Sequence, residues 1–218
     1  MTRLRTAILI SGRGSNMDAL IEAARAQNFP AEIALVLSNR PDAPGLARAK
    51  TAGVATAAVD HKIHAGREEF ERSLQIMLET YRIDFICLAG FMRLFTPWFI
   101  GQWKGRMLNV HPALLPSYKG LHTHERALAD GVKIHGCTVH FVVPEMDEGP
   151  IVAQAAVPVL DADTPETLGA RVLAQEHVIY PLALRLAASG AVRVVGNRVL
   201  GAAPKAHGGA LVVPNLFV

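Results

Sequence analysis

The pattern of apolar residues along the chain is the feature that most limits its fold. Four nearly continuous apolar runs have the length of strands, at residues 6–10, 32–37, 54–59 and 83–89. Such runs are typical of parallel strands that helices cover on both faces. Between them, residues 16–27 and 65–81 place apolar side chains three and four positions apart, which predicts amphipathic helices. This alternation predicts an α/β domain with an open, doubly wound, mostly parallel sheet.

The pattern changes after residue 107. Residues 132–143 and 149–160 predict two strands joined by the short connection PEMDE, which favours an antiparallel pair. A long helix is predicted over 165–188, because Thr164 is a good N-cap and Pro165 suits the first helical position. The sheet is therefore expected to have an antiparallel C-terminal portion.

Composition places further limits on the class of protein. The chain has 218 residues, half of them hydrophobic, so we predict one domain over 1–190 and a tail over 191–218 that could form a hairpin. The net charge is only +3 and the basic residues are not clustered, which does not favour a nucleic-acid partner. The apolar run before Gly12 is too short for a signal peptide or a membrane span, so we expect a cytoplasmic protein without a membrane partner. Cys87 and Cys137 lie in apolar runs and are expected to be reduced core residues.

The segment SGRGSN follows the first predicted strand and opens the first predicted helix. Glycines there let the backbone approach a ligand, and the free N–H groups of a helix N-terminus attract an anion. Ser15 and Asn16 could also cap the helix. The segment matches neither GxGxxG nor a P-loop, so a single phosphate is favoured over a dinucleotide. A plain tight turn remains the alternative.

Two further loops carry candidate binding groups. After the strand that ends at Leu88, the segment AGFMRLFTP supplies Met92, Leu94 and Phe95, which could wall a pocket for a flat ring or simply fill the core. In NVHP, Asn109 and His111 lie two apart and so face the same way on a strand. A carboxamide can donate to a developing oxyanion and an imidazole can transfer a proton, although a turn would use the same residues.

Asp147, in the turn PEMDEGP, could supply a third group. A carboxylate beside His111 would stabilise the protonated imidazole. No serine sits in a GxSxG turn, and neither cysteine is flanked like a catalytic thiol. The three residues together therefore favour direct transfer between two bound substrates, without a covalent enzyme intermediate.

The nine histidines also raise the possibility of a metal. His122 and His124 are two apart, whereas His135 and His140 face opposite sides of a predicted strand. Neither HExxH nor a Cys/His quartet is present, so we predict no metal and keep a zinc hydrolase built on 122–140 as an alternative.

Several segments in this order resemble one known family. They are SGRGSNMDALIEA, SNRPDAPGLARA, LAGFMRLFTP, LNVHPALLPSYKGLHTHERAL, HGCTVHFV, DEGPI and ARVLAQEHVIYP. Together they are similar to the phosphoribosylglycinamide formyltransferases, folate-dependent enzymes of purine synthesis, from about residue 5 to 188. The resemblance implies a Rossmann-like fold, with a phosphate-binding half over 1–100 and a catalytic and folate-binding half over 101–190. It also implies transfer of a formyl group from 10-formyltetrahydrofolate to the amine of 5'-phosphoribosylglycinamide.

The resemblance also implies roles for individual residues. Asn109, His111 and Asp147 match the catalytic residues, Gly14, Ser15 and Asn16 match the phosphate-binding loop, and Glu176 matches a residue that contacts the ribose. The residues implied in folate binding are Arg67, Met92, Arg93, Leu94, Phe95, Asn109, Val143, Pro144, Glu145, Met146 and Asp147. Residues 118–134 match a loop that is mobile in the family and closes over the site.

Three other functions remain as alternatives. A formyltetrahydrofolate hydrolase would usually carry an extra N-terminal domain, and a transfer-RNA formyltransferase an extra C-terminal one. A non-catalytic nucleotide-binding module would use the SGRGSN segment but would leave NVHP and DEGP unexplained. A monomer and a homodimer are equally compatible with the sequence.

Overall fold

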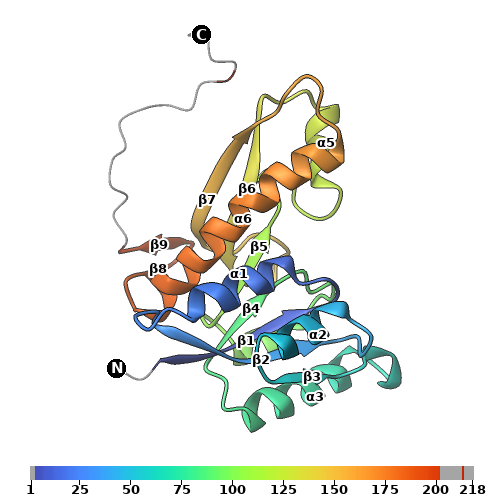
Figure 1. Ribbon diagram of the computed structural model, residues 1–218, viewed down its shortest axis with the longest axis vertical. Helices are drawn as coiled ribbons and strands as arrows, with labels where there is room; N and C mark the ends of the chain where they lie inside the picture. Colours follow the sequence, from blue (N-terminus) through green and yellow to red (C-terminus); the bar gives the residue numbers. More distant parts are fainter. Residues whose placement is uncertain (1–2, 202–212, 214–218) are drawn as a thin grey trace.

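A computed structural model describes residues 3–201 and Val213. These residues form a seven-stranded sheet in the order β3-β2-β1-β4-β5-β6-β7 (Figure 1). The strands are β1 Leu4–Ile10, β2 Ala31–Ser38, β3 Thr56–Ala58, β4 Phe85–Leu88, β5 Met107–His111, β6 Ile134–Phe141 and β7 Ile151–Pro158. The first five strands pair in parallel, while β6 pairs antiparallel with both β5 and β7. The predicted α/β fold, a Rossmann-like open and mostly parallel sheet with an antiparallel C-terminal portion, is confirmed.

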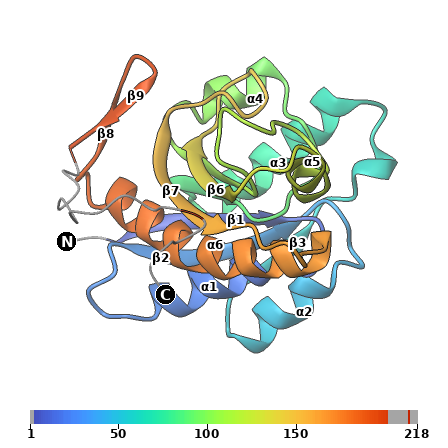
Figure 2. The same cartoon turned by 90° about the horizontal axis from the view of Figure 1, so that it is seen from above.

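The helices cover both faces of this sheet. They are α1 Ser15–Ala24, α2 Pro44–Thr51, α3 Arg67–Thr80, α4 Pro97–Gln102, α5 Thr123–Ala129 and α6 Pro165–Ala188, with a 3-10 turn at His61–Ile63. Helices α1, α2 and α6 lie on one side of the sheet, and α3 and α4 lie on the other (Figure 2). Three short helices were not predicted: α2, α4 and α5. A helix of eight residues or fewer is too short to show a clear repeat of apolar residues.

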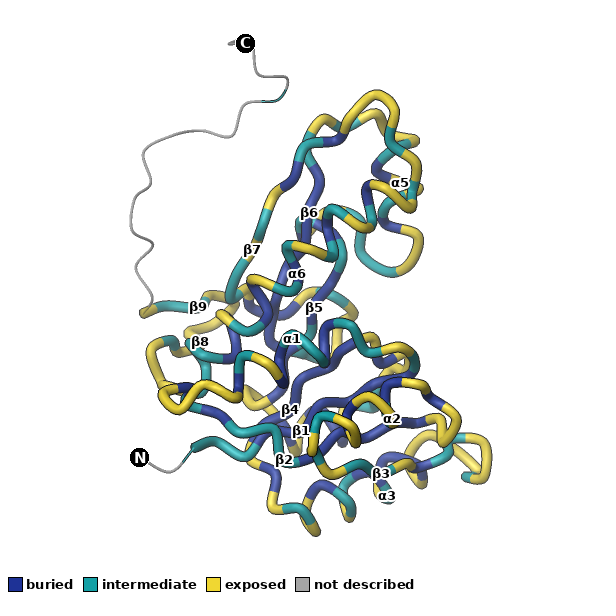
Figure 3. The backbone as a smooth tube through the Cα atoms, in the orientation of Figure 1, coloured by how far each residue is buried: buried dark blue, intermediate teal, exposed yellow. Residues whose placement is uncertain are grey.

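Two apolar layers hold the sheet between the helices. On one face, Ile8 and Ile10 of β1 pack with the buried side chains of α1 and α6. On the other face, Ala7 and Leu9 pack with α3 and α4. Successive residues of β1 therefore point into different layers, and β4 and the last five residues of β1 are buried (Figure 3). This burial on both faces explains the continuous apolar runs of the sequence.

The end of the chain adds a small second sheet. Within the predicted tail 191–218, Arg193–Val195 (β8) and Arg198–Leu200 (β9) form an antiparallel hairpin. Apart from Val213, the rest of the tail after Gly201 lies outside the described residues. None of the helices formed by residues 3–201 is both long and apolar enough to cross a membrane.

The register of the central strands brings their carboxyl ends to one edge. Leu9 of β1 pairs with Leu88 of β4, and Leu88 pairs with Asn109 of β5. The order of strands reverses between β1 and β4, which is where ligands bind in open α/β sheets. The loops that follow these three strands therefore meet at one place.

Helix α6 has a defined start, and one of its side chains ties it to the sheet. Its first turn carries a capping box, in which Thr164 accepts from the backbone N–H of Thr167 (3.3 Å) and Thr167 accepts from that of Thr164 (2.9 Å). Near its other end, the buried Tyr180 hydroxyl donates to the carbonyl of Leu88 (2.9 Å). The predicted helix 165–188 and its N-cap are therefore both confirmed.

Removal of this cap should weaken the fold by a small, measurable amount. We expect Thr164→Ala to lower the free energy of unfolding by about 1 kcal/mol, because the Thr167 N–H loses its acceptor. Urea unfolding followed by circular dichroism measures the change. The control is Thr51→Ala on α2, where the exposed hydroxyl only bonds its own helix, at the carbonyl of Ala47. A loss no larger than that of the control would contradict the role of the cap.

Candidate active site

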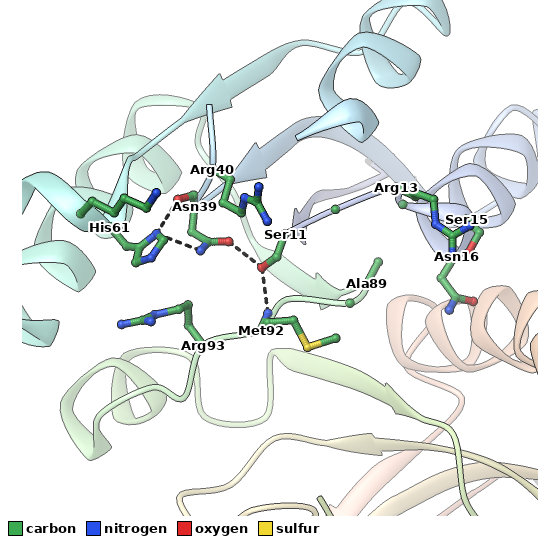
Figure 4. Close-up of a pocket in the computed structure, with 14 residues that line it drawn as sticks. Ser11, Arg13, Ser15, Asn16, Asn39, Arg40, His61, Ala89, Met92 and Arg93 are labelled. Atoms are coloured by element: carbon green, nitrogen blue, oxygen red, sulfur yellow. Dashed lines mark hydrogen bonds between the residues drawn. The ribbon is translucent and has the colours of Figure 1, made fainter. Parts of the chain in front are cut away.

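Three loops meet around one hollow at the carboxyl edge of the sheet. The hollow has a volume of about 690 Å³ and is lined by Ser11, Gly12, Arg13, Gly14, Ser15, Asn16, Asn39, Arg40, His61, Lys62, Ala89, Gly90, Met92 and Arg93. The Ser11 hydroxyl joins the loops, because it accepts the N–H of Met92 (2.8 Å) and donates to Asn39 Oδ1 (2.5 Å) (Figure 4). The predicted phosphate loop and the loop after β4 thus lie side by side.

The phosphate loop has the backbone expected of an anion site. Gly14 is the N-cap of α1 and has φ of 75°, the left-handed conformation that glycine adopts without strain. No side chain caps α1, so the prediction that Ser15 or Asn16 does so is wrong. The N–H groups of its first turn are consequently available to a ligand.

Asn16 instead reaches across to α6. Its Nδ2 donates to Glu176 Oε2 (2.6 Å), and both side chains are buried. Burial raises the pKa of Glu176, and the hydrogen bond from Asn16 only partly offsets it. The Oδ1 of Asn16 is buried without a partner among the described residues, so it can accept a hydrogen bond from a ligand. The two residues implied in phosphate and ribose binding are therefore in direct contact.

The carboxylate of Asp147 folds back onto β5. Its Oδ2 lies 3.5 Å from Nδ1 of His111, and both side chains are largely buried. Asp147 has φ of 57°, and its Oδ2 also accepts the N–H of Gly120 (2.9 Å). On the other side of the ring, His111 Nε2 lies 2.9 Å from the Tyr118 carbonyl. Both neighbours of the ring are acceptors, an arrangement that a ring with a proton on each nitrogen satisfies in full.

A fourth residue, His140, orients Asn109. The two residues are opposite each other in the β5–β6 ladder, and His140 Nε2 lies 3.3 Å from Asn109 Nδ2. Burial lowers the pKa of His140, so its ring is neutral near pH 7. Its Nδ1–H then donates to the Phe141 carbonyl (3.0 Å), which leaves Nε2 to accept from the carboxamide. One N–H of the Asn109 carboxamide thereby donates to His140, and the other can donate to a ligand.

Sequence reasoning considered His140 only as a metal ligand. The register of an antiparallel pair would have placed it opposite Asn109, which is the signal that was missed. His135 does face elsewhere, as predicted, and its Nε2 lies 3.2 Å from Nδ1 of His124. Within residues 3–201, no three His, Cys, Asp or Glu side chains gather as a metal-binding group. Burial raises the pKa of the Cys87 and Cys137 thiols to about 12, so neither is a reactive nucleophile.

Of the residues implied in folate binding, Met92 and Arg93 line the hollow, and the others do not. Met92, Leu94 and Met146 expose 69%, 61% and 52% of their surface, which is unusual for large apolar side chains. The turn that contains Val143, Pro144 and Glu145 leads into Asp147. Phe95, by contrast, is stacked between Phe91 and Phe99, with centroids 5.2 and 4.5 Å away, as part of the core. Arg67 is exposed at the start of α3 and does not line the hollow, whereas Arg93 does.

The segment 118–122 lies against the Asp147 turn. Lys119 forms an ion pair with Glu148 (2.8 Å), next to the bond between Gly120 and Asp147. Behind it, the buried Thr138 hydroxyl accepts the N–H of Leu115 (3.0 Å) and donates to the Ala113 carbonyl (2.7 Å). The connection after His111 is thus fixed at its start by Thr138 and bonded to Asp147 and Glu148 at its end.

These features define the class of protein. An open α/β sheet that carries an anion-binding helix N-terminus and, at the same edge, a carboxamide beside a buried imidazole and a largely buried carboxylate is typical of enzymes that act on small anionic substrates. The family model described as "Formyl transferase" matches residues 4–184. The chain belongs to this family.

Relatives and solved structures give the same family. The chain is 44% identical over 190 residues to the phosphoribosylglycinamide formyltransferase of Escherichia coli K12, covering 87% of this chain and 90% of the relative. It is 48% identical over 195 residues to the human trifunctional purine biosynthetic protein adenosine-3; the match covers 89% of this chain but only 19% of that protein. The crystal structure of a phosphoribosylglycinamide formyltransferase from Brucella melitensis has a TM-score of 0.83 at 55% identity, covering 89% and 99% of the two chains.

The buried carboxyl of Glu176 should make the free energy of unfolding depend on pH. Its folded-state pKa lies above the ordinary value of 4.5, so the native state binds the extra proton and the cost of burying the charge grows as the pH rises. We expect Glu176→Gln to raise the free energy of unfolding at about pH 7.5 and to have less effect at about pH 4.5. Urea unfolding at the two pH values measures both changes.

Glu22→Gln is the matched control, because Glu22 is exposed on α1 and pairs only with Arg25. Its effect should stay within about 0.5 kcal/mol. A lower free energy of unfolding in Glu176→Gln at the higher pH would show that the buried carboxylate does not destabilise the fold.

Proposed function

We propose that this protein transfers the formyl group of 10-formyltetrahydrofolate to the amine of 5'-phosphoribosylglycinamide in purine biosynthesis. The carrying observation is the position of Asp147 3.5 Å from His111, at the end of β5, on the edge of the sheet where the end of β1 leads into the phosphate loop. Membership of the formyl transferase family supports the reaction type. The names of relatives over nearly their full length support the substrates.

The phosphoribosyl substrate binds along α1. Its phosphate takes the N–H groups at Gly14, Ser15 and Asn16, where the helix dipole favours an anion. A ribose hydroxyl donates to Glu176 or to the unpaired Oδ1 of Asn16. These contacts leave the amine end of the substrate directed toward β5. Residues 1–100 therefore supply most of this binding half, within one domain over 1–190.

The folate co-substrate binds between the loop after β4 and the turn before Asp147. The exposed Met92, Leu94 and Met146 supply apolar surface for its ring, and the backbone of 143–147 supplies polar groups. Phe95 does not contact the ring but stabilises this loop by stacking on Phe91 and Phe99. Asn109 is at the end of the cleft. Arg67 and Arg93 are cations for the anionic end of the molecule. This half lies mainly in residues 101–190.

The reaction is direct attack within the complex of both substrates. The neutral amine nitrogen attacks the formyl carbon, the bond from that carbon to N10 breaks, and the amine proton passes to N10. Holding the reactants together contributes up to roughly 7–11 kcal/mol in ideal cases. The N–H of Asn109 and the protonated His111 stabilise the oxyanion, and one such donor contributes about 3 kcal/mol. Asp147 keeps the His111 ring oriented.

We also propose where the protein acts and which partners it has. A cytoplasmic enzyme with these two small substrates needs neither a nucleic acid nor a membrane as partner. Either a monomer or a homodimer satisfies it, because every residue assigned a role comes from this chain. A coupled assay with both substrates tests the reaction, and absence of formyl transfer at saturating concentrations would overturn it. Release of formate without transfer would assign the chain to a folate hydrolase instead.

The catalytic roles have their own test. We expect His111→Ala and Asp147→Asn each to lower kcat by about 10²–10⁴, with KM for both substrates changing far less. Asparagine tolerates the positive φ at position 147, so the turn should persist. Steady-state kinetics with both substrates measures the separation of kcat from KM.

Asp161→Asn is the control for removal of a carboxylate. Asp161 is exposed and, among the described residues, pairs only with Lys133 (3.2 Å), so the kcat of the variant should equal that of the wild type. An unchanged kcat in either main variant removes that residue from the mechanism.

A further inference from the structure

The segment 118–122 lies beside the His111–Asp147 contact without being part of the core. None of its residues is buried, and Leu121 exposes 70% of its surface. Apolar packing therefore does little to hold the segment in place. Its position depends on polar contacts, and two of them reach residues with a proposed catalytic role. The Tyr118 carbonyl lies 2.9 Å from His111 Nε2, and the Gly120 N–H donates to Asp147 (2.9 Å).

The backbone on both sides of this contact is in an uncommon conformation. Tyr118 has φ of 55° and Asp147 has φ of 57°, in the left-handed region that few residues other than glycine adopt. This conformation costs free energy, most of all for a bulky side chain such as that of Tyr118. Such backbone persists only where the surrounding contacts hold it. An interaction that joins the two segments is therefore needed to keep them in this position.

The ion pair between Lys119 and Glu148 is such an interaction. Lys119 Nζ lies 2.8 Å from Glu148 Oε1, and the two residues directly adjoin Gly120 and Asp147 in the sequence. Two consecutive residues of one segment are thus bonded to two consecutive residues of the other. The ion pair and the bond from Gly120 to Asp147 therefore form together in one register and are lost together when the segments separate.

The Gly120 contact reaches the carboxylate oxygen that faces the imidazole. Asp147 Oδ2 accepts the Gly120 N–H and also lies 3.5 Å from His111 Nδ1. The acceptor on the other side of the ring, the Tyr118 carbonyl, belongs to segment 118–122 itself. A displacement of this segment would thus disturb both neighbours of the His111 ring at once.

We propose that Lys119 and Glu148 are positioning residues for the formyl transfer, and this inference rests on the proposed function. Their ion pair holds segment 118–122 against the Asp147 turn and so keeps both acceptors beside the His111 ring. Neither side chain lines the hollow of the phosphate loop, so the pair acts on the rate within the bound complex and not on binding of the phosphoribosyl substrate. The two side chains are 35% and 51% exposed, so the effect of their ion pair is moderate.

The kinetic test is a double-variant cycle. We expect Lys119→Ala and Glu148→Ala each to lower kcat by about 3–5-fold, with KM for 5'-phosphoribosylglycinamide within about 2-fold of the wild type. The double variant should be no slower than either single variant, because the second substitution removes a pair that is already lost. The reversed pair Lys119→Glu/Glu148→Lys should return kcat to within about 2-fold of the wild type. Loss of two merely structural side chains would not be repaired in this way.

Amide hydrogen exchange at Gly120, followed by NMR, tests the contact without substrates. We expect Lys119→Ala to speed exchange of the Gly120 N–H by about 3–5-fold, because this group spends less time bonded to Asp147. The measurement needs no turnover, so it still tests the ion pair if the wild type does not transfer a formyl group. That failure would count against the proposed function, which keeps the two failures distinct.

Arg198→Ala is the matched control. Lys119, Glu148 and Arg198 line the same second hollow, of about 440 Å³, but among the described residues Arg198 forms no ion pair. The control should keep the wild-type kcat and exchange rate. A control as slow as Lys119→Ala would overturn the inference, since the effect would then reflect the charge of the hollow. Additive losses in the double variant, or unchanged kcat or exchange in Lys119→Ala, would overturn it as well.

Discussion

The carboxylate of Asp147 holds together the parts of the site that come from separate segments. It lies 3.5 Å from His111 on β5, and it accepts the N–H of Gly120. A largely buried carboxylate needs such partners, because desolvation without them is costly. One charge thus joins the turn after β6, the end of β5 and segment 118–122.

The same edge is stabilised from the opposite side by α6. Its capping box sets where the helix starts, and Tyr180 ties it to the carbonyl of Leu88. Glu176 lies between these two points and faces Asn16 on α1. The fold therefore places the buried carboxyl of Glu176 next to the phosphate loop. Burying this group opposes folding, and functional sites commonly lower stability in this way.

Much of the fold could be predicted because local patterns decide it. Continuous apolar runs identified the strands, and Thr164 with Pro165 marked the start of α6 to the residue. Asn109 and His111 were recognisable as a pair because alternation along a strand is a local property. His140 and the Asn16–Glu176 contact were not predictable in this way. They depend on register and on packing between segments up to 160 residues apart, which no local pattern encodes. The capping role expected of Asn16 failed because α1 begins at Ser15 with Gly14 as its N-cap, which places Asn16 inside the first turn.

The Ser11 hydroxyl has a consequence for how two ligands affect each other. It touches the loop after β4 through Met92 and the end of β2 through Asn39, and its own loop leads into α1. A ligand that orders any one of these segments restricts the other two, so part of the entropy cost of the second ligand is already met. By thermodynamic reciprocity, each substrate then strengthens the binding of the other by the same factor. A side chain that touches neither reacting atom would in this way set the cooperativity of the enzyme.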